Sequence, residues 1–291
     1  MFEGTYTAIV TPFRDGKVDE KALRALVREQ IAGGVDGLVP CGSTGESATM
    51  NHAEHERVIA ITIEEAAGKV KVMAGTGSNN TAEAISLTSY AKRAGADAAL
   101  LISPYYNKPT QAGHVAHYRA IADATGLPLF VYNIPGRTGV NMLPETLAEM
   151  AEHPMIVGVK EASGSLDQIS RLIQLTGGKM TVLSGDDSLT LPMMAVGAHG
   201  VIAVASNVWP SKVCEMVRAA RADNFEKARA CHYELLPVIQ ALFTETNPIP
   251  VKAAMAMLGK MSGELRLPLT PVTEPNRVRL EAALRNAKIL E

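Results

Sequence analysis

The sequence predicts an α/β protein, a TIM (β/α)8 barrel with a small helical extension at its C-terminus. Short apolar segments rich in Val, Ile and Leu recur eight times in the first 205 residues, and helical segments separate them. Segments that are apolar throughout are typical of parallel strands buried on both faces. Eight such repeats indicate a closed barrel rather than an open doubly wound sheet.

The predicted strands and helices alternate in chain order. The strands are Thr5–Val10, Gly37–Cys41, Val70–Ala74, Ala98–Ser103, Leu129–Asn133, Ile156–Lys160, Thr181–Ser184 and Gly200–Val204. Asp19 is placed to cap the first helix. The apolar face of that helix consists of Leu23, Leu26, Val27 and Ile31. Ser165 is placed to cap a later helix, and Gln168 three residues on predicts a capping box.

From Pro210 to Leu290 the pattern is helical only. Eight barrel units leave this stretch over, so part of it is expected to be the last barrel helix. We therefore predict a barrel over residues 1–223 and a helical extension over residues 224–291, packed against the barrel.

The composition argues against several classes of protein. The formal net charge is −2 and the pI about 6.4, whereas proteins that bind nucleic acid or anionic membranes usually carry a basic face. Cys41, Cys214 and Cys231 form no paired motif, which fits a reducing compartment. The N-terminus does not resemble a signal peptide, and no apolar run reaches the roughly 18 residues of a membrane span. We expect a cytoplasmic protein.

Polar residues follow the predicted strands, at the end of a TIM barrel where reacting groups lie. Lys160 ends an otherwise apolar strand, so its side chain is expected to enter the barrel. Burial lowers the pKa of an amine and makes a neutral nucleophile available near pH 7. Such an amine attacks a ketone to form an imine, which then acts as an electron sink. The alternative is a lysine paired with Glu161 or with an aspartate at the barrel mouth.

Other polar side chains at this end have two interpretations. Tyr132 and Tyr106 can transfer protons beside Lys160, or they are rim aromatics with solvated hydroxyls. Arg137 can pair with a substrate carboxylate, or it is a surface charge. The loop 42–45 lacks the phosphate-loop pattern, so its N–H groups and hydroxyls suit a small carboxylate or carbonyl better than a nucleotide.

A metal site fits the sequence less well. His52 and His55 are three residues apart, as are His114 and His117, but neither pair has a third ligand nearby in the sequence. The Asp186–Asp187 pair is expected to cap a helix rather than to hold a cation. We predict no metal.

Four motifs stand in order at the predicted strand ends. They are GSTGES at residues 42–47, YYN at 105–107, YNIPGRTG at 132–139 and VGVKEASG at 157–164. Together they resemble the pyruvate-dependent Schiff-base enzymes of the N-acetylneuraminate lyase superfamily, and the likeness covers nearly the whole chain. Within it, the sequence is most similar to the dihydrodipicolinate synthase family. Those lyases condense pyruvate with L-aspartate 4-semialdehyde to 4-hydroxy-tetrahydrodipicolinate, in the diaminopimelate route to lysine.

The resemblance implies catalytic roles for four residues. Lys160 matches the imine-forming lysine, and Tyr132 matches the tyrosine that moves protons to and from pyruvate. Ser43 and Tyr106 match the rest of a hydroxyl relay, with Tyr106 expected to reach across a subunit interface. The family more often has threonine at the position of Ser43. The hydroxyl is kept with a freer rotamer, so we expect activity with altered kinetics.

The resemblance also implies a substrate site. Thr44 and Ile202 match positions that hold pyruvate, Gly185 lies beside it, and Arg137 matches the arginine that binds the carboxylate of the second substrate. Relatives that process sugar acids generally lack this arginine. Two alternatives stay open. One is a pyruvate-releasing aldolase acting on a sugar acid or a 4-hydroxy-2-oxo acid, and the other is a barrel that senses a keto acid or amino acid without turnover.

Finally, the resemblance implies an allosteric site for the inhibitor L-lysine at a dimer interface. The matching positions are Ser47, Ala48, His52, His55, Asn79, Glu83 and Tyr105. The alternative is a polar interface patch without a ligand. The resemblance further implies a homotetramer, arranged as a dimer of dimers, and no cofactor besides the covalent imine of pyruvate with Lys160.

Overall fold

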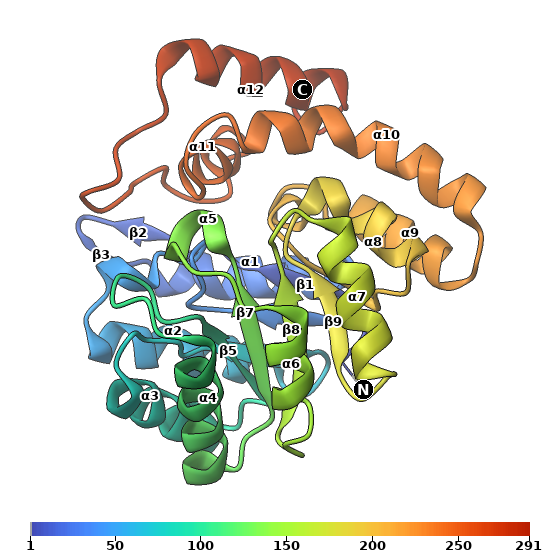
Figure 1. Cartoon of the computed structure of the whole chain (residues 1–291). Coiled ribbons are helices and arrows are strands. Elements are labelled where there is room, and N and C mark those ends of the chain that lie inside the picture. The colour runs from blue at the N-terminus through green and yellow to red at the C-terminus, as the bar shows by residue number, and fades with distance from the viewer. Residues whose placement is uncertain (1) are drawn as a thin grey trace.

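The computed structural model describes residues 2–291, and its centre is a closed barrel of eight parallel strands (Figure 1). Around the barrel the strands pair in the order β1-β10-β9-β8-β7-β6-β5-β4, and β4 closes on β1. The strands are β1 Gly4–Ala8, β4 Gly37–Val39, β5 Lys71–Gly75, β6 Ala98–Ile102, β7 Leu129–Asn133, β8 Ile156–Glu161, β9 Thr181–Ser184 and β10 Gly200–Ala203. The predicted TIM barrel is confirmed, and each predicted strand overlaps an observed one.

Most of the helices surround the barrel, and the last ones follow it in the chain. They are α1 Glu20–Ala32, α2 His52–Ala66, α3 Thr81–Ala94, α4 Gln111–Thr125, α5 Pro135–Thr138, α6 Pro144–Met150, α7 Leu166–Thr176, α8 Thr190–Ala195, α9 Pro210–Arg221, α10 Phe225–Leu242, α11 Ile249–Met257 and α12 Glu274–Asn286. Three short 3-10 helices are η1 Ser47–Thr49, η2 Asp187–Leu189 and η3 Ala205–Asn207. Asp19 caps α1, as predicted, by accepting from the N–H of Ala22 at 3.0 Å.

Two local details differ from the prediction. The Ser165 hydroxyl accepts from the N–H of Gln168 at 3.2 Å, but the Gln168 side chain donates to Asn141 at 3.1 Å instead of completing a capping box. The structure also contains a small hairpin that we did not predict, formed by β2 Phe13–Arg14 and β3 Lys17–Val18. Its turn is an Asp-Gly pair with positive φ at both residues, which is a common hairpin turn.

Two layers of apolar side chains form the core. One fills the space between the strands and the helices, and the other fills the barrel interior. Large side chains inside the barrel face glycines. A Cβ on Gly158 would lie 2.1 Å from the Phe130 ring, and a Cβ on Gly37 would lie 2.2 Å from the Tyr6 ring. These glycines let the aromatic rings fill the interior, so reacting groups can lie only at its open end.

The C-terminal helices pack on the barrel and on one another. α10 contacts both α9 and α12, and α11 contacts α12, α10 and η3. Figure 1 shows α11 and α12 stacked above the rest of the molecule. The boundary between residues 223 and 224 falls in the turn between α9 and α10. The division of the chain into two units at this turn stays a prediction.

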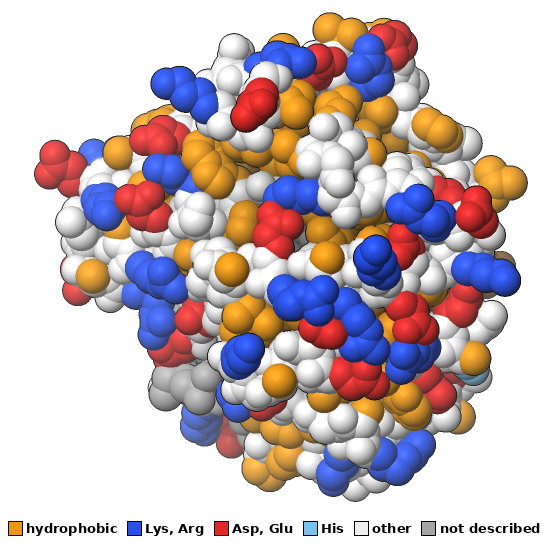
Figure 2. Space-filling view, turned by 180° about the vertical axis from the view of Figure 1, so that it is seen from behind, with side chains coloured by type: hydrophobic (Ala, Val, Ile, Leu, Met, Phe, Trp, Pro, Cys, Tyr) orange, Lys and Arg blue, Asp and Glu red, His pale blue; other side chains and the backbone are white. Residues whose placement is uncertain are grey.

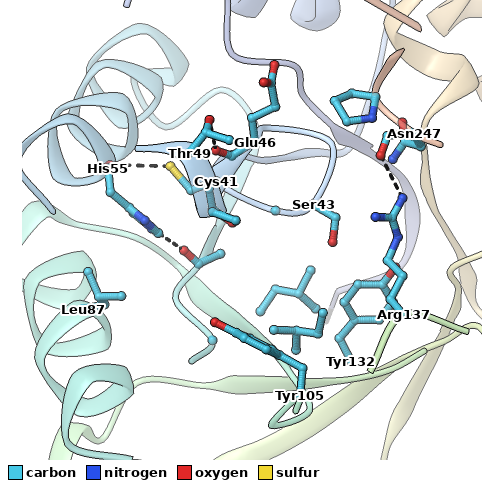
Figure 3. Close-up of a pocket in the computed structure, with 18 of the residues that line it drawn as sticks. Cys41, Ser43, Glu46, Thr49, His55, Leu87, Tyr105, Tyr132, Arg137 and Asn247 are labelled. Carbon is cyan, nitrogen blue, oxygen red and sulfur yellow. Dashed lines mark hydrogen bonds between the residues drawn. The ribbon is translucent and has the colours of Figure 1, made fainter. Parts of the chain in front are cut away.

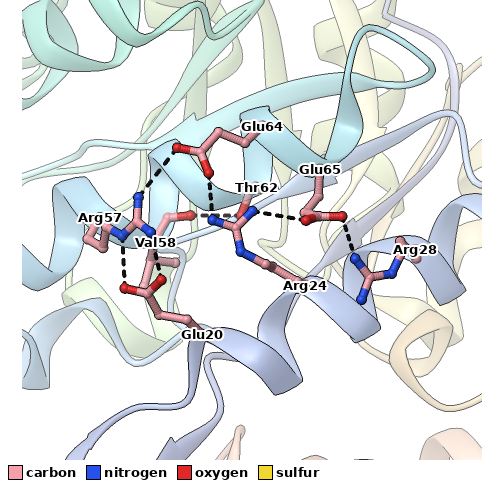
Figure 4. A network of polar contacts seen from close by, with 8 residues as sticks. All are labelled: Glu20, Arg24, Arg28, Arg57, Val58, Thr62, Glu64 and Glu65. Atoms are coloured by element: carbon pink, nitrogen blue, oxygen red, sulfur yellow. Dashed lines mark hydrogen bonds and ion pairs between the residues drawn. The ribbon is translucent and has the colours of Figure 1, made fainter.

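The surface carries charges of both signs. Figure 2 shows acidic and basic side chains interspersed over one face. On the outside of the barrel, ion pairs join α1 to α2, with Arg24 between Glu64 and Glu65 and Arg57 between Glu20 and Glu64 (Figure 4). Exposed pairs of this kind each contribute little to stability. Within residues 2–291, no helix has both the length and the apolar composition needed to cross a membrane.

Candidate active site

Lys160 lies near the C-terminal end of β8, beside Tyr132 of β7 and Leu183 of β9 in the strand register. Its side chain is buried, and burial is the main reason that its pKa falls from 10.5 to about 8; nearby Asp187 opposes this shift and Arg137 adds to it. A fall of that size raises the neutral fraction of the amine at pH 7 roughly 300-fold. Lys160 therefore has the property that a nucleophilic amine needs.

The alternative of a lysine paired with Glu161 is wrong. Successive residues of a strand point to opposite faces, and the Glu161 carboxylate faces the helices. It accepts hydrogen bonds from Asn133 Nδ2 at 3.1 Å and from the N–H of Ser163 at 2.6 Å. Among residues 2–291, no carboxylate forms an ion pair with Lys160. The amine is left available for a reaction.

Gly185 makes room for the Lys160 side chain. A Cβ at this position would lie 3.0 Å from Lys160 Cγ and 3.1 Å from Lys160 Cε, and 2.9 Å from Ala162 Cβ. Only glycine leaves the side chain of Lys160 in place, because a Cβ at position 185 would come too close to the methylene groups of the lysine. Ile202 of β10 is also fully buried in the interior cluster that contains Tyr132.

Asp187 is a buried carboxylate whose charge acts on Lys160. It accepts from the N–H of Val204 at 3.0 Å and from the N–H of Ala205 at 2.6 Å, which fixes the end of β10. Burial raises its pKa to about 6. Asp186 caps η2 through the N–H of Ser188, so the predicted capping role holds for Asp186 but not for Asp187.

Tyr132 is buried beside the lysine. Lys160 Nζ lies 4.3 Å from the centre of its ring. Burial raises the pKa of the phenol above its usual range, whereas Arg137 lowers it. The phenol is therefore protonated at neutral pH and can donate a proton to a bound substrate.

The loop after β4 places two hydroxyls at the site. It begins at Cys41, whose φ of 57° is left-handed, and turns through a hydrogen bond from the N–H of Gly45 to the carbonyl of Gly42 at 3.1 Å. Ser43 lines the cavity, and Thr44 is buried. The Thr44 hydroxyl accepts from Asn247 Nδ2 at 2.9 Å.

Arg137 is held at the cavity by the C-terminal part of the chain. It lies on α5, a single turn of helix begun by Pro135, and its guanidinium donates to the carbonyl of Asn247 at 2.8 Å. A guanidinium carries further N–H groups that can bind a carboxylate. The sequence alone does not single out Asn247. The available signal was a polar Thr-Asn-Pro stretch that interrupts an otherwise helical region.

A cavity of about 510 Å³ joins these residues to a second polar group. In Figure 3, Ser43, Tyr132 and Arg137 lie on one side, while His55 and Leu87 lie on the other. Tyr132 lines the cavity, and Lys160 lies behind it, against the Tyr132 ring, without lining the cavity itself. The cavity therefore connects the predicted catalytic end with most of the predicted lysine site.

The second polar group is centred on Glu83. Its carboxylate is 2.8 Å from His52 Nε2 and accepts from the Ser78 hydroxyl, and these contacts lower the pKa of Glu83. His55 is buried, which lowers its pKa, and its Nε2 is 2.7 Å from the carbonyl of Gly75. Ser47, Ala48 and Tyr105 also line this part of the cavity. Asn79 does not line it, although its amide donates to the carbonyl of Tyr105 at 3.2 Å.

Tyr106 is not brought to Lys160 within the chain. Its side chain is 88% exposed and does not line the cavity, unlike that of Tyr105. The second histidine pair is also separate from the site. His114 and His117 are buried on α4, and His117 Nδ1 is 2.9 Å from the Thr81 hydroxyl.

Comparisons with known proteins agree on one family. The model of the dihydrodipicolinate synthetase family matches residues 1–287. A 4-hydroxy-tetrahydrodipicolinate synthase from Geotalea uraniireducens is 56% identical over 285 residues, which is 98% of each chain.

Solved structures share both fold and sequence with the chain. One is a chloride-inhibited dihydrodipicolinate synthase from Acinetobacter baumannii in complex with pyruvate, with a TM-score of 0.98, 45% identity and 100% coverage of both chains. Another is the enzyme from Cyanidioschyzon merolae with lysine bound, with a TM-score of 0.97, 42% identity and 99% coverage of both chains.

Proposed function

The chain belongs to the dihydrodipicolinate synthetase family, and we propose that Lys160 is the residue that performs its covalent chemistry. The activity is that of a 4-hydroxy-tetrahydrodipicolinate synthase, a lyase that joins pyruvate to L-aspartate 4-semialdehyde in lysine biosynthesis. The observation that carries the assignment of Lys160 is a buried amine with a lowered pKa at the open end of the barrel, which forms no ion pair with a carboxylate of residues 2–291.

In this mechanism, Lys160 Nζ attacks the ketone carbon of pyruvate. The oxygen leaves as water and a protonated imine remains. Loss of a proton from the methyl carbon then gives an enamine, because the electron pair of the broken C–H bond moves toward the imine nitrogen. The enamine carbon attacks the aldehyde carbon of the second substrate, the aldehyde oxygen takes up a proton, and the imine is restored. Attack of water or of the substrate's own amino group on the imine carbon then breaks the bond to Lys160. Since the imine is the electron sink, we propose that no metal or organic cofactor takes part.

Tyr132 is the proposed proton carrier for these steps. It is the register partner of Lys160 and lies against its amine, so a substrate attached to Lys160 is within reach of the phenol. Thr44, Gly185 and Ile202 are proposed to bound the pyruvate site. The Thr44 hydroxyl can contact the substrate, and Ile202 lies near the end of β10. Gly185 leaves space for the substrate because it has no side chain.

Ser43 and Tyr106 are proposed to complete a hydroxyl relay. Ser43 lines the cavity, but Tyr106 is exposed in the single chain. Its contribution therefore requires a second copy whose Tyr106 enters the neighbouring cavity. This requirement supports a homo-oligomer, and we propose a tetramer formed as a dimer of dimers. A Ser43→Thr variant that lost activity would argue against the role of Ser43.

Arg137 is proposed to select the second substrate. Its guanidinium meets the cavity beside Tyr132, where the carboxylate of an aldehyde acid would approach the enamine. A sugar acid would instead need donors and acceptors for several hydroxyl groups. A pyruvate-releasing aldolase and a sensor without turnover are the alternatives that the experiment below separates.

The test combines a trapping reaction with an assay of turnover. Incubation with pyruvate and borohydride should add one reduced pyruvate unit to the intact mass, and peptide mapping should place it on Lys160. A Lys160→Met variant should show no adduct, whereas the exposed control Lys179→Met should behave like the parent. No adduct in folded protein would refute the mechanism. Turnover of L-aspartate 4-semialdehyde distinguishes a synthase from both an aldolase and a sensor.

We also propose that the Glu83 end of the cavity binds L-lysine as an inhibitor. A carboxylate between His52 and Ser78 can accept from an ammonium group, and the relative from Cyanidioschyzon merolae was solved with lysine bound. A cytoplasmic location remains a prediction. The three cysteines are all free and buried, as expected for a reducing compartment.

A further inference from the structure

Beneath the loop that carries Ser43 and Thr44 lies an ion pair that is fully shielded from solvent. The side chains of Glu46 and Lys252 are both 0% exposed, and Glu46 Oε1 is 2.5 Å from Lys252 Nζ. The two residues come from opposite ends of the chain, one from the loop after β4 and the other from α11.

Glu46 is tied directly to the residues of the pyruvate site. Its N–H donates to the carbonyl of Ser43 at 3.2 Å, and its φ of 52° is left-handed, which non-glycine residues seldom adopt. The Thr11 hydroxyl donates to the carbonyl of Gly45 at 2.7 Å. Glu46 lines the cavity together with Ser43, but its carboxylate is shielded from solvent and paired with Lys252.

Lys252 is tied to the residues of the second-substrate site. Its N–H donates to the carbonyl of Pro248 at 3.0 Å, one turn of α11 away. The preceding residue, Asn247, accepts from Arg137 through its carbonyl and donates to Thr44 through its amide. The ion pair therefore joins the loop of the pyruvate site to the segment that holds Arg137.

The surroundings leave neither charge free to move. Lys252 Nζ and the Arg266 guanidinium lie 4.3 Å and 4.1 Å from the centre of the Phe13 ring. The Arg266 guanidinium also donates to both oxygens of Glu54, at 2.8 Å and 2.6 Å. The backbone N–H of Arg266 donates to Glu46 Oε2 at 3.3 Å. Burial lowers the pKa of Lys252, whereas Glu46 opposes that shift.

A buried ion pair of this kind contributes little stability compared with apolar side chains of the same volume, because both charges lose their hydration. Its fixed geometry is the better explanation for it. We propose that Glu46 and Lys252 are positioning residues, which hold the pyruvate loop and Arg137 at the separation that the condensation needs. This inference rests on the proposed function, and it gives the C-terminal helices a part in the reaction.

The experiment compares the single variants Glu46→Gln and Lys252→Met with the double variant. Each is assayed well below its Tm for the rate of pyruvate trapping by borohydride and for the KM of L-aspartate 4-semialdehyde. A single variant leaves one charge unpaired, so its Tm should fall. The trapping rate should fall and the KM for L-aspartate 4-semialdehyde should rise. We expect kcat/KM to be reduced roughly 10- to 100-fold, because small displacements of reacting groups have effects of that size.

The double variant separates positioning from stability. Without an unpaired charge its Tm should recover, but kcat/KM should stay low, since a neutral pair does not fix the same geometry. A double variant that regained both would show that the pair serves stability alone, and the proposal would be wrong. The double variant also keeps the test valid if a single variant does not fold.

The matched control is Lys260→Met. Lys260 also joins the C-terminal part of the chain to the barrel, but its ion pair is with Glu29 of α1 rather than with a residue of the loop 42–47. Its kcat/KM should stay within about twofold of the parent value, as is usual for substitutions away from a site. If the parent protein forms no pyruvate adduct, the proposed function fails; if the parent does and all variants match it, only the positioning role fails.

Discussion

Lys160 and Tyr132 are register partners on neighbouring barrel strands, and Lys160 Nζ lies 4.3 Å from the centre of the Tyr132 ring. Both side chains point into the barrel because residues paired across parallel strands share a face. Burial lowers the pKa of the amine and raises that of the phenol. At neutral pH the pair thus combines an amine that is neutral in part with a phenol that can donate a proton. Most of the following predictions test this pair and its immediate neighbours.

Tyr132→Phe should separate proton transfer from imine formation. The variant keeps the ring against Lys160 but loses the hydroxyl, so kcat should fall by about 10²- to 10⁴-fold, the usual effect of removing a general acid or base. Borohydride should still trap some pyruvate on Lys160. A variant with unchanged kcat would exclude Tyr132 as the proton carrier.

The rate of pyruvate trapping should depend on pH through Lys160. The neutral amine is the nucleophile, so the rate should rise with pH and level off above about 8, the pKa of Lys160. Asp187 has a pKa of about 6 and is ionised in this range, where it favours the ammonium form. Asp187→Asn should therefore move the midpoint to lower pH.

The control for that shift is Asp186→Asn. Asp186 caps η2, and asparagine can cap a helix as well, so the midpoint of trapping should stay where it is in the parent. A midpoint that moves equally in both variants, or in neither, would show that Asp187 does not set the charge of Lys160.

Gly185→Ala should displace the side chain of Lys160. The new Cβ would lie 3.0 Å from Lys160 Cγ and 2.9 Å from Ala162 Cβ, so the lysine stem or the backbone has to move. We expect a loss of stability of about 1–3 kcal/mol, as for other overpacked sites. The trapping rate, measured well below the Tm, should fall at least about tenfold. Unchanged trapping would mean that the stem has room to spare.

Arg137→Gln should raise the KM for L-aspartate 4-semialdehyde while leaving pyruvate trapping intact. Loss of hydrogen bonds to a charged group predicts a change of about 10- to 100-fold. Because Arg137 helps to lower the pKa of Lys160, trapping is compared on the high-pH plateau of each protein, where the amine is neutral. A normal KM would remove the reason to assign the second substrate to this residue.

Glu83→Gln should abolish inhibition by L-lysine and leave the uninhibited rate within about twofold of the parent. The amide cannot pair with an ammonium group, and Glu83 lies at the end of the cavity away from Arg137. Steady-state rates at increasing lysine concentration provide the measurement. If the parent is insensitive to millimolar lysine, the effector site itself is excluded.

The sequence alone determined the fold and singled out Lys160 as the proposed nucleophile. Strands apolar on both faces alternate with capped helices, and this pattern is local, so it can be counted along the chain. Lys160 stood out because a charged residue at the end of an apolar strand has to be near an open end of the barrel. The order of the strands then followed from the closure of eight repeats.

Only the tertiary structure decided which distant segments complete the site. Asn247 reaches Arg137 and Thr44, and Lys252 reaches Glu46 across 206 positions of sequence, contacts that no local pattern encodes. The direction of a side chain was equally undetermined. Glu161 turns to the opposite face of its strand from Lys160 and accepts from Asn133, and Tyr106 is exposed to solvent. Periodicity in the sequence locates the strands and helices, whereas tertiary packing decides which residues contact one another.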